Sequence, residues 1–97
     1  MGGYVYIACN SNHRTLYVGV TSNLVEQMLK HREHFYANYF TQKYKCGKLV
    51  YYKWFDQIED AFKEKERIKT TNRKKKTELI NGMNKGWKDL FGEIKLR

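Results

Sequence analysis

Two short runs of aromatic and β-branched residues, at positions 4–9 and 15–20, constrain the fold of this chain more than any other feature. Residues of these types favour β-strands. The polar residues 10–14 between the two runs favour a turn. Strands that are joined by so short a turn pair as an antiparallel hairpin. Gly19 interrupts the second run, which indicates either a bulge or a backbone that another group approaches closely.

Alternation along a strand predicts which side chains of the first run lie together. Successive side chains of a strand point to opposite faces, so Tyr4 and Tyr6 should share one face. The other face should then carry Val5, Ile7 and Cys9.

The residues after the hairpin predict a helix, a loop and a third strand. The helix begins near Leu24 behind a cap within residues 21–23, and Glu26 can bond back to that cap. Residues 35–47 are aromatic and polar without a clean period, which indicates an ordered loop. Residues 48–55 are again aromatic and β-branched and predict the third strand.

Two further helices and a tail complete an α+β domain with a small sheet, in the order ββαβαα. Asp56 is placed to cap a helix that runs through Ile68. A break at residues 70–72 precedes the next helix, which ends at residues 81–82. The tail at residues 87–91 predicts a short helix or turn that packs its aromatic side chains on the sheet.

The composition fits one domain, residues 1–97, that is attracted to polyanions. Lys and Arg outnumber Asp and Glu by 19 to 10, a formal charge of +9, so nucleic acid is the first expected partner. No apolar run approaches the ~20 residues that span a membrane, so we expect a cytoplasmic protein without membrane contact. Cys9 and Cys46 are expected to be ordinary thiols, because their spacing fits neither a disulfide framework nor a zinc site.

The ordered motifs of the chain resemble those of the GIY-YIG nuclease superfamily. Tyr4-Val5-Tyr6 and Tyr17-Val18-Gly19 stand one strand apart, like the paired tripeptides that name the superfamily. The resemblance continues through residues 21–24 leading to His31, 48–52, 58–61, 83–84 and 87–90. The chain is similar in this way to the small, single-domain bacterial branch. The resemblance implies a three-stranded antiparallel sheet flanked by helices, and hydrolysis of a DNA phosphodiester with one divalent metal ion such as Mg²⁺.

Several residues match positions that the superfamily uses at its catalytic site. Tyr6 and Tyr17 stand at the tyrosines of the two tripeptides, although the residues alone would allow a pair that only packs across the hairpin. His31 follows position 27 by one helical turn, so both should face the same cleft; its alternative is a helix cap or surface histidine. Asn84 matches an asparagine that either supports the cleft or caps the last helix.

Two charged groups that the resemblance implies are missing. Position 27, where the superfamily has an arginine, holds Gln27, which cannot grip a phosphate with a charged fork. In the register of residues 58–61, the metal-binding glutamate falls at Lys65, which cannot ligate Mg²⁺. Glu64 and Glu66 flank this lysine, and a register slip of one residue would restore a carboxylate ligand.

The positive charge concentrates in residues 63–76, where eight Lys or Arg stand against two Glu. Four contiguous basic residues lie at the predicted start of a helix, where they do nothing for the helix dipole. We expect these four to contact phosphates without reading sequence, the alternative being a solvated face: Arg73, Lys74, Lys75 and Lys76. Four aromatic residues of the loop could stack on an unpaired base or fill the core: Tyr36, Tyr39, Phe40 and Tyr44.

The sequence therefore favours a GIY-YIG-like domain that binds DNA and whose catalytic site is impaired. Two alternatives stay open. One is an active, Mg²⁺-dependent DNA endonuclease that uses displaced residues. The other is a basic RNA-binding module, which shares the charge but does not account for the hairpin motifs. Mg²⁺ is the expected cofactor of an active enzyme, and no cofactor is expected otherwise.

Overall fold

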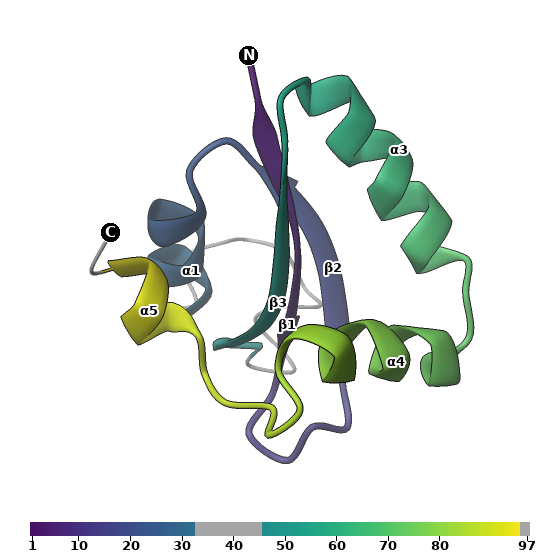
Figure 1. Ribbon diagram of the computed structural model, residues 1–97. Coiled ribbons are helices and arrows are strands. Elements are labelled where there is room, and N and C mark those ends of the chain that lie inside the picture. Colours follow the sequence, from purple (N-terminus) through teal and green to yellow (C-terminus); the bar gives the residue numbers. More distant parts are fainter. Residues whose placement is uncertain (33–45, 96–97) are drawn as a thin grey trace.

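The computed structural model describes residues 1–32 and 46–95, and its centre is a three-stranded antiparallel sheet. The strands are β1 (Gly3–Cys9), β2 (Leu16–Thr21) and β3 (Lys48–Phe55). Their order in the sheet is β2-β1-β3, so the first strand of the chain occupies the middle (Figure 1). The hairpin predicted from the two aromatic runs is therefore confirmed.

Helices cover both faces of the sheet, as the α+β prediction requires. α1 (Leu24–Arg32) and α5 (Phe91–Lys95) lie on one side, and α3 (Ile58–Lys69) and α4 (Arg73–Met83) lie on the other (Figure 1). α4 ends one residue beyond the predicted position, and α5 begins at the last residue of the predicted tail. Among the described residues, every helix is too short or too polar to cross a membrane.

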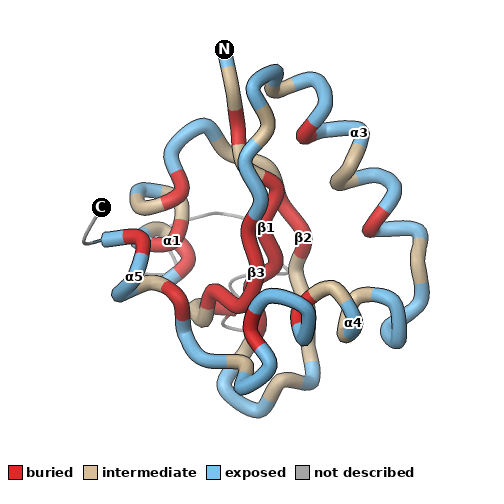
Figure 2. The backbone as a smooth tube through the Cα atoms, in the orientation of Figure 1, coloured by how far each residue is buried: buried red, intermediate tan, exposed pale blue. Residues whose placement is uncertain are grey.

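The alternation predicted for β1 is confirmed and gives the sheet two packed faces. Buried positions concentrate along the three strands (Figure 2). The buried residues toward α3 and α4 are Val5, Ile7, Cys9, Val18, Val50, Tyr51, Ile68 and Ile80. Those toward α1 and α5 are Tyr6, Ala8, Leu24, Met28, Cys46, Leu49, Tyr52, Leu90 and Ile94. Tyr6 is fully buried despite its hydroxyl, so this hydroxyl needs a partner inside the protein.

The bulge considered for Gly19 lies in another strand. β1 pairs with β2 without interruption, whereas its register with β3 shifts between Ile7 and Ala8. Val50 is the extra residue of this bulge, and as a result Val50 and the following Tyr51 both face α3 and α4. The remaining explanation for Gly19, a close approach by another group, is the correct one, because the ring of Tyr6 lies against it.

Helix capping follows the prediction at α1 but not at α3. The side-chain oxygen of Asn23 accepts a hydrogen bond from the Glu26 N–H at 3.1 Å, and its amide lies 3.4 Å from the Glu26 carboxylate. The cap predicted at Asp56 is wrong, because Gln57 stands at the N-cap and makes no side-chain cap bond. Asp56 instead accepts a hydrogen bond from the indole of Trp54 at 2.9 Å.

The C-terminal tail packs its aromatic side chains on the sheet, as predicted. Trp87 contacts the α3 and α4 core, whereas Phe91 contacts the α1 and α5 core. The Leu90 N–H between them donates to the carbonyl of Leu49 at 2.8 Å, so the tail is tied to β3 as it passes from one face to the other. The loop residues proposed for base stacking lie outside the described residues: Tyr36, Tyr39, Phe40 and Tyr44.

Candidate functional site

Three polar side chains from β1 and α1 meet in one hydrogen-bonded cluster. The hydroxyl of Tyr6 lies 2.8 Å from Nε2 of His31, and the side-chain amide of Gln27 donates to the same hydroxyl at 3.1 Å. Gln27 and His31 are one turn apart on α1, so both side chains reach the same position on the sheet. The structure thus brings together three of the residues that the sequence assigned to the site.

Tyr17 joins this cluster from β2. Its ring centroid lies 5.1 Å from that of His31 and 6.2 Å from that of Tyr6. Tyr6 and His31 meet nearly edge to face, with an interplanar angle of 85°. The two tyrosines therefore pack across the hairpin, and they do so around the imidazole that α1 supplies.

Burial decides the charge state of the cluster. His31 is 1% exposed, and loss of hydration lowers its pKa to about 4, although a hydrogen bond to the backbone of Cys46 acts in the opposite direction. The imidazole is therefore neutral at pH 7. The hydroxyl of Tyr6 accepts a bond from Gln27 and shares a second bond with Nε2 of His31, whose direction is set by the imidazole tautomer. The cluster is a chain of neutral groups.

Gly19 provides the space that the Tyr6 ring occupies. The two residues are paired directly across β1 and β2, and a Cβ on Gly19 would lie 2.6 Å from both Cζ and Oη of Tyr6. Close-packed interiors do not accommodate contacts this short, so the ring would have to move. The glycine of the second tripeptide is therefore required by the tyrosine of the first.

The residues predicted around a metal position lie on α3, across the sheet from α1 (Figure 1). Ala61 faces the sheet, and Lys65 projects about 40° around the helix from it, half-buried. Glu64 accepts two hydrogen bonds from the guanidinium of Arg67, at 2.8 and 2.6 Å, which lowers the pKa of its carboxyl. Glu66 is exposed and points away from the sheet, about 140° from Ala61.

Asn84 lies outside the Tyr6 cluster and links three backbone segments. Its side-chain amide donates to the carbonyls of Val50 and Lys88 at 3.2 and 2.7 Å, and its carbonyl accepts from the Lys88 N–H at 3.0 Å. It also stands at the C-cap of α4. Asn84 therefore fastens the β3 bulge to the connection between α4 and α5.

The four basic residues at the start of α4 do not form one uniform surface. Arg73 donates two hydrogen bonds to backbone carbonyls of the β1–β2 turn. Lys76 donates to a backbone carbonyl just before the helix, at 2.5 Å. Lys74 and Lys75 are exposed. Half of this segment is thus engaged in holding the fold.

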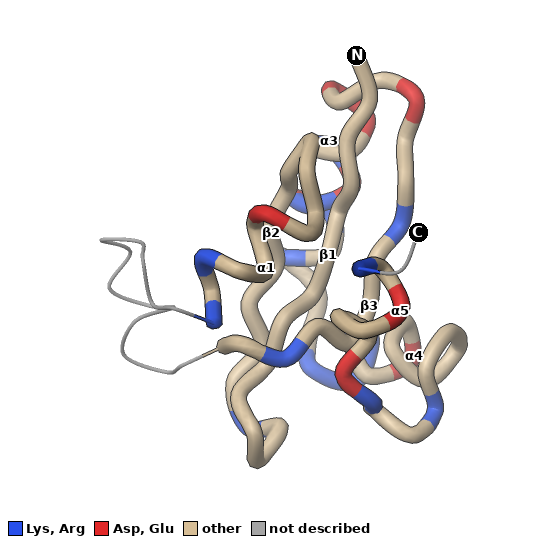
Figure 3. The backbone as a smooth tube through the Cα atoms, turned by 90° about the vertical axis from the view of Figure 1, so that its left-hand side faces the viewer, with Lys and Arg blue, Asp and Glu red and all other residues tan. Residues whose placement is uncertain are grey.

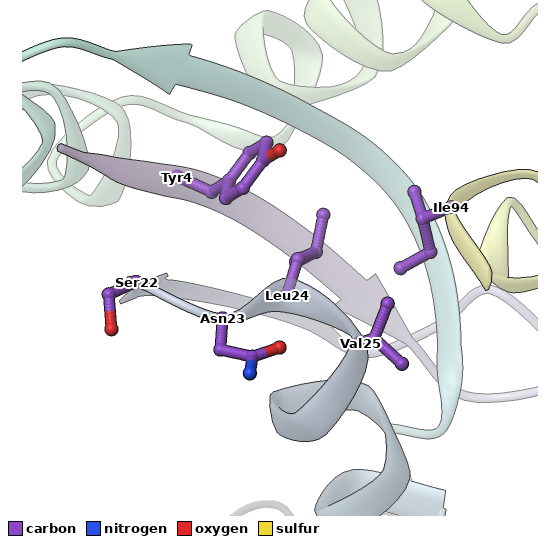
Figure 4. Close-up of a pocket in the computed structure, with 6 residues that line it drawn as sticks. All are labelled: Tyr4, Ser22, Asn23, Leu24, Val25 and Ile94. Carbon is purple, nitrogen blue, oxygen red and sulfur yellow. The ribbon is translucent and has the colours of Figure 1, made fainter. Parts of the chain in front are cut away.

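A pocket outside the Tyr6 cluster was missed by the sequence reasoning. It has a volume of about 230 Å³ and lies at the N-terminal end of α1 (Figure 4). Its apolar lining comes from Tyr4, Leu24, Val25 and Ile94, and Ser22 and Asn23 lie at its edge. Alternation could have placed the Tyr4 side chain there, but nothing in the sequence connects Ile94 of α5 with α1.

Comparison with known proteins decides the family. The family model described as the GIY-YIG catalytic domain matches residues 2–78. The chain belongs to the GIY-YIG family. It is 34% identical over 79 residues to a UPF0213 protein of Staphylococcus saprophyticus, which covers 80% of this chain and 93% of the relative. It is 31% identical over 77 residues to a UPF0213 protein of Syntrophus aciditrophicus, which covers 79% and 87% respectively.

A solved structure confirms the GIY-YIG-like fold. The solution NMR structure of a UPF0213 protein from Bacillus halodurans superposes with a TM-score of 0.56 at 24% sequence identity. The match covers 92% of this chain and 93% of the other. The resemblance inferred from the paired tripeptides, to small bacterial members of this superfamily, is therefore confirmed.

GIY-YIG nucleases are generally metal-dependent, yet the described residues of this chain do not fit a metal ion. No group of three His, Cys, Asp or Glu side chains within residues 1–32 and 46–95 could hold one. Glu64 is bonded to Arg67, and Lys65 places an ammonium group where the resemblance implies a carboxylate. These residues provide no basis for a metal-dependent step.

Proposed function

We propose that this chain is a GIY-YIG domain that binds nucleic acid, DNA in the first place, and that hydrolyses phosphodiester bonds weakly or not at all. The observation that carries the proposal is the hydrogen bond from Gln27 to the buried hydroxyl of Tyr6. At this position the family resemblance implies an arginine. Family membership and the formal charge of +9 support nucleic acid as the partner.

The neutrality of the cluster argues against efficient catalysis. Negative charge grows on the phosphoryl oxygens as a phosphodiester is attacked, and an enzyme offsets it with cations or a metal ion. Tyr6, Gln27 and His31 can orient a ligand by hydrogen bonds, but at pH 7 they carry no charge. Loss of one preorganised donor typically slows a reaction by about 10²–10³. Loss of the arginine together with the metal ligand would leave little activity.

The position of Lys65 on α3 supports the same proposal. Glu64 interacts with Tyr51 and Lys53 of β3, which indicates that it lies on the β3 flank of the helix. The next residue, Lys65, lies about 100° further around, on the flank toward β2. A lysine there can attract a phosphate without a metal ion. We therefore expect binding that does not require Mg²⁺.

An active nuclease with displaced residues needs a carboxylate in place of Lys65. Glu64 is engaged by Arg67, and Glu66 points away from the sheet, so both are poorly placed for this role. Asn84 has a structural role in the proposed function, because it holds together the backbone segments at Val50 and Lys88.

Binding is tested by fluorescence anisotropy with a labelled DNA duplex and an RNA duplex of equal length, in EDTA and in Mg²⁺. We expect comparable DNA affinity in both buffers. DNA binding that requires Mg²⁺ would contradict the metal-independent interpretation, and a strong preference for RNA would favour the basic RNA-binding module.

Repair of the two missing charges tests the catalytic half of the proposal. Gln27→Arg combined with Lys65→Glu should increase nicking of plasmid DNA in Mg²⁺ well above the wild type. If both groups act on the same transition state, each single change should do much less. Tyr17→Phe in the repaired protein should remove the gain if that hydroxyl helps to activate the water.

Lys63→Glu, combined with Gln27→Arg, is the matched control for this repair. It makes the same charge change on the exposed outer face of α3, about 200° from Ala61. This control should not increase nicking. If the wild type already cuts as fast as the repaired protein, the impaired-enzyme proposal is wrong.

A further inference from the structure

Three elements converge on the turn between β1 and β2, at the lower end of the sheet in Figure 1. β3 contributes Lys48, whose Nζ lies 2.7 Å from Nε2 of His13 in the turn. α4 contributes Arg73, whose guanidinium donates to the backbone carbonyls of His13 and Arg14. The connection between α4 and α5 contributes Trp87, whose ring stacks on the imidazole with centroids 5.0 Å apart. We call His13, Lys48, Arg73 and Trp87 the basic corner.

The two cations of the basic corner are held by neutral acceptors rather than by carboxylates. The ion pairs among the described residues are Lys30–Glu26, Arg32–Asp89 and Arg67–Glu64. Lys48 and Arg73 belong to none of these pairs. Both cations act on the same neighbours, because each lowers the pKa of His13 and each acts on the thiol of Cys9. The one carboxylate that also acts on Cys9, Asp89, is already paired with Arg32.

The basic corner is therefore a fixed pair of positive charges without a counter-charge in the described part of the chain. Lys and Arg positions also occur on the side of α1 and α5, but there Asp and Glu positions lie among them (Figure 3). The N-terminus of α4 contributes nothing further, because Asn72 caps it by accepting from the Lys75 N–H at 3.0 Å. The unbalanced charge comes from side chains that three elements position.

We propose that the basic corner binds one phosphate group of the nucleic-acid backbone, between the ammonium of Lys48, the guanidinium of Arg73 and the imidazole of His13. The proposal rests on the nucleic-acid binding proposed above and names a contact outside the Tyr6 cluster. Arg73 uses two of its five N–H donors on the turn carbonyls, and Lys48 uses one of three on His13. The remaining donors are available to phosphate oxygens.

Preorganisation distinguishes this site from the exposed lysines of α4. Lys74 and Lys75 must lose side-chain freedom when they contact a phosphate. Arg73 is already held by two backbone carbonyls of the turn and keeps these bonds, so it loses less. The ring stack that closes the corner joins two residues with left-handed backbones, His13 with φ 61° and Trp87 with φ 52°. Such conformations cost energy and persist only where surrounding contacts maintain them.

Phosphate binding should change the role of His13. Burial and the two neighbouring cations lower the pKa of this imidazole, and in its neutral form it accepts a hydrogen bond from Lys48. A bound anion favours the imidazolium form, which donates instead of accepting. His13 and Lys48 would then both donate to the phosphate, so binding should raise the pKa of His13.

The site itself is tested by NMR of the wild-type protein with inorganic phosphate as the probe. The imidazole resonances of His13 are followed across pH at increasing phosphate and constant ionic strength. The expected result is a saturable increase in the pKa of His13 and no change for the buried His31. A response of His13 no larger than that produced by chloride would overturn the proposal.

A labelled DNA duplex and two lysine variants test whether the bound phosphate belongs to the nucleic-acid backbone. Lys48→Met should weaken binding about tenfold, whereas Lys63→Met, on the outer face of α3, should weaken it only about twofold. Thermal unfolding checks that both variants are folded. An equal loss of duplex affinity in the two variants would mean that Lys48 acts only through the net charge of the protein, and would overturn the proposal.

Two other outcomes separate this site from the function proposed above. If His13 responds to phosphate while Lys48→Met leaves duplex affinity unchanged, the site binds free phosphate and not the nucleic-acid backbone. The nucleic-acid binding proposed above would still stand. If the wild type binds no nucleic acid, the proposed function is wrong. The proposed contact with a backbone phosphate is then wrong too, whatever the phosphate titration gives.

Discussion

Gly19→Ala should destabilise the protein by about 1–3 kcal/mol, because the added methyl group overpacks the space beside Tyr6. The new Cβ would lie 2.6 Å from Cζ and Oη of the tyrosine and 2.8 Å from its Cε1. Ordinary carbon contacts are about 3.5–4.0 Å, so the ring must move by about 1 Å. A shift of this size breaks the hydrogen bonds of the hydroxyl to His31 and Gln27, each worth about 0.5–1.5 kcal/mol.

A double-mutant cycle isolates the interaction energy between Gly19→Ala and the ring of Tyr6. Tyr6→Leu removes the ring that the methyl group would strike, so in that background Gly19→Ala should be neutral or stabilise by up to about 1 kcal/mol, since glycine weakens a strand. The coupling between the two sites should therefore be about 2 kcal/mol. Gly82→Ala is the control: a Cβ there meets nothing within 4 Å, and alanine should stabilise α4 by about 0.5–1 kcal/mol.

Urea denaturation at pH 7, followed by circular dichroism, measures the four free energies of unfolding of the cycle and that of the control. For a domain of this size, each kcal/mol also corresponds to about 4–8 °C in Tm. If Gly19→Ala has the stability of the wild type, or if the two substitutions are additive, Tyr6 does not require the glycine. The physical link between the two tripeptides would then be wrong.

Three further measurements test the site and its surroundings. The folded pKa of His31, about 4, lies below the ordinary value of 6.5, so the unfolded state binds more protons between these values; stability should fall as pH is lowered through this window, and His31→Gln should flatten the fall. Calorimetry with Mg²⁺ should detect no sub-millimolar site; a tight one would make Glu64 or Glu66 the ligand. Replacing Lys74 and Lys75 by Gln should reduce the slope of log K against log salt by up to about 1.8 if both contact phosphates, and an unchanged slope would remove them from the interface.

Features that depend on neighbours along the chain follow from the sequence alone. The hairpin results from two strand-forming runs and a short turn, and alternation along β1 is enough to assign Tyr6 and Ile7 to opposite faces. The capping arrangement of Asn23 and Glu26 follows from their spacing in the same way. The family, too, can be recognised from ordered motifs, because its tripeptides occupy fixed strand positions.

Properties that arise between distant segments depend instead on tertiary packing. His31 is neutral because α1 buries it against Tyr6, 25 residues away. The residues next to His31 in the chain do not predict this burial. Arg73 belongs to a basic run, yet it reaches a turn about 60 residues earlier and holds it. Local rules act over a few residues, whereas desolvation, close approach and charge pairing depend on which surfaces packing brings together. The fold was therefore predictable, but the electrostatic character of the site was not.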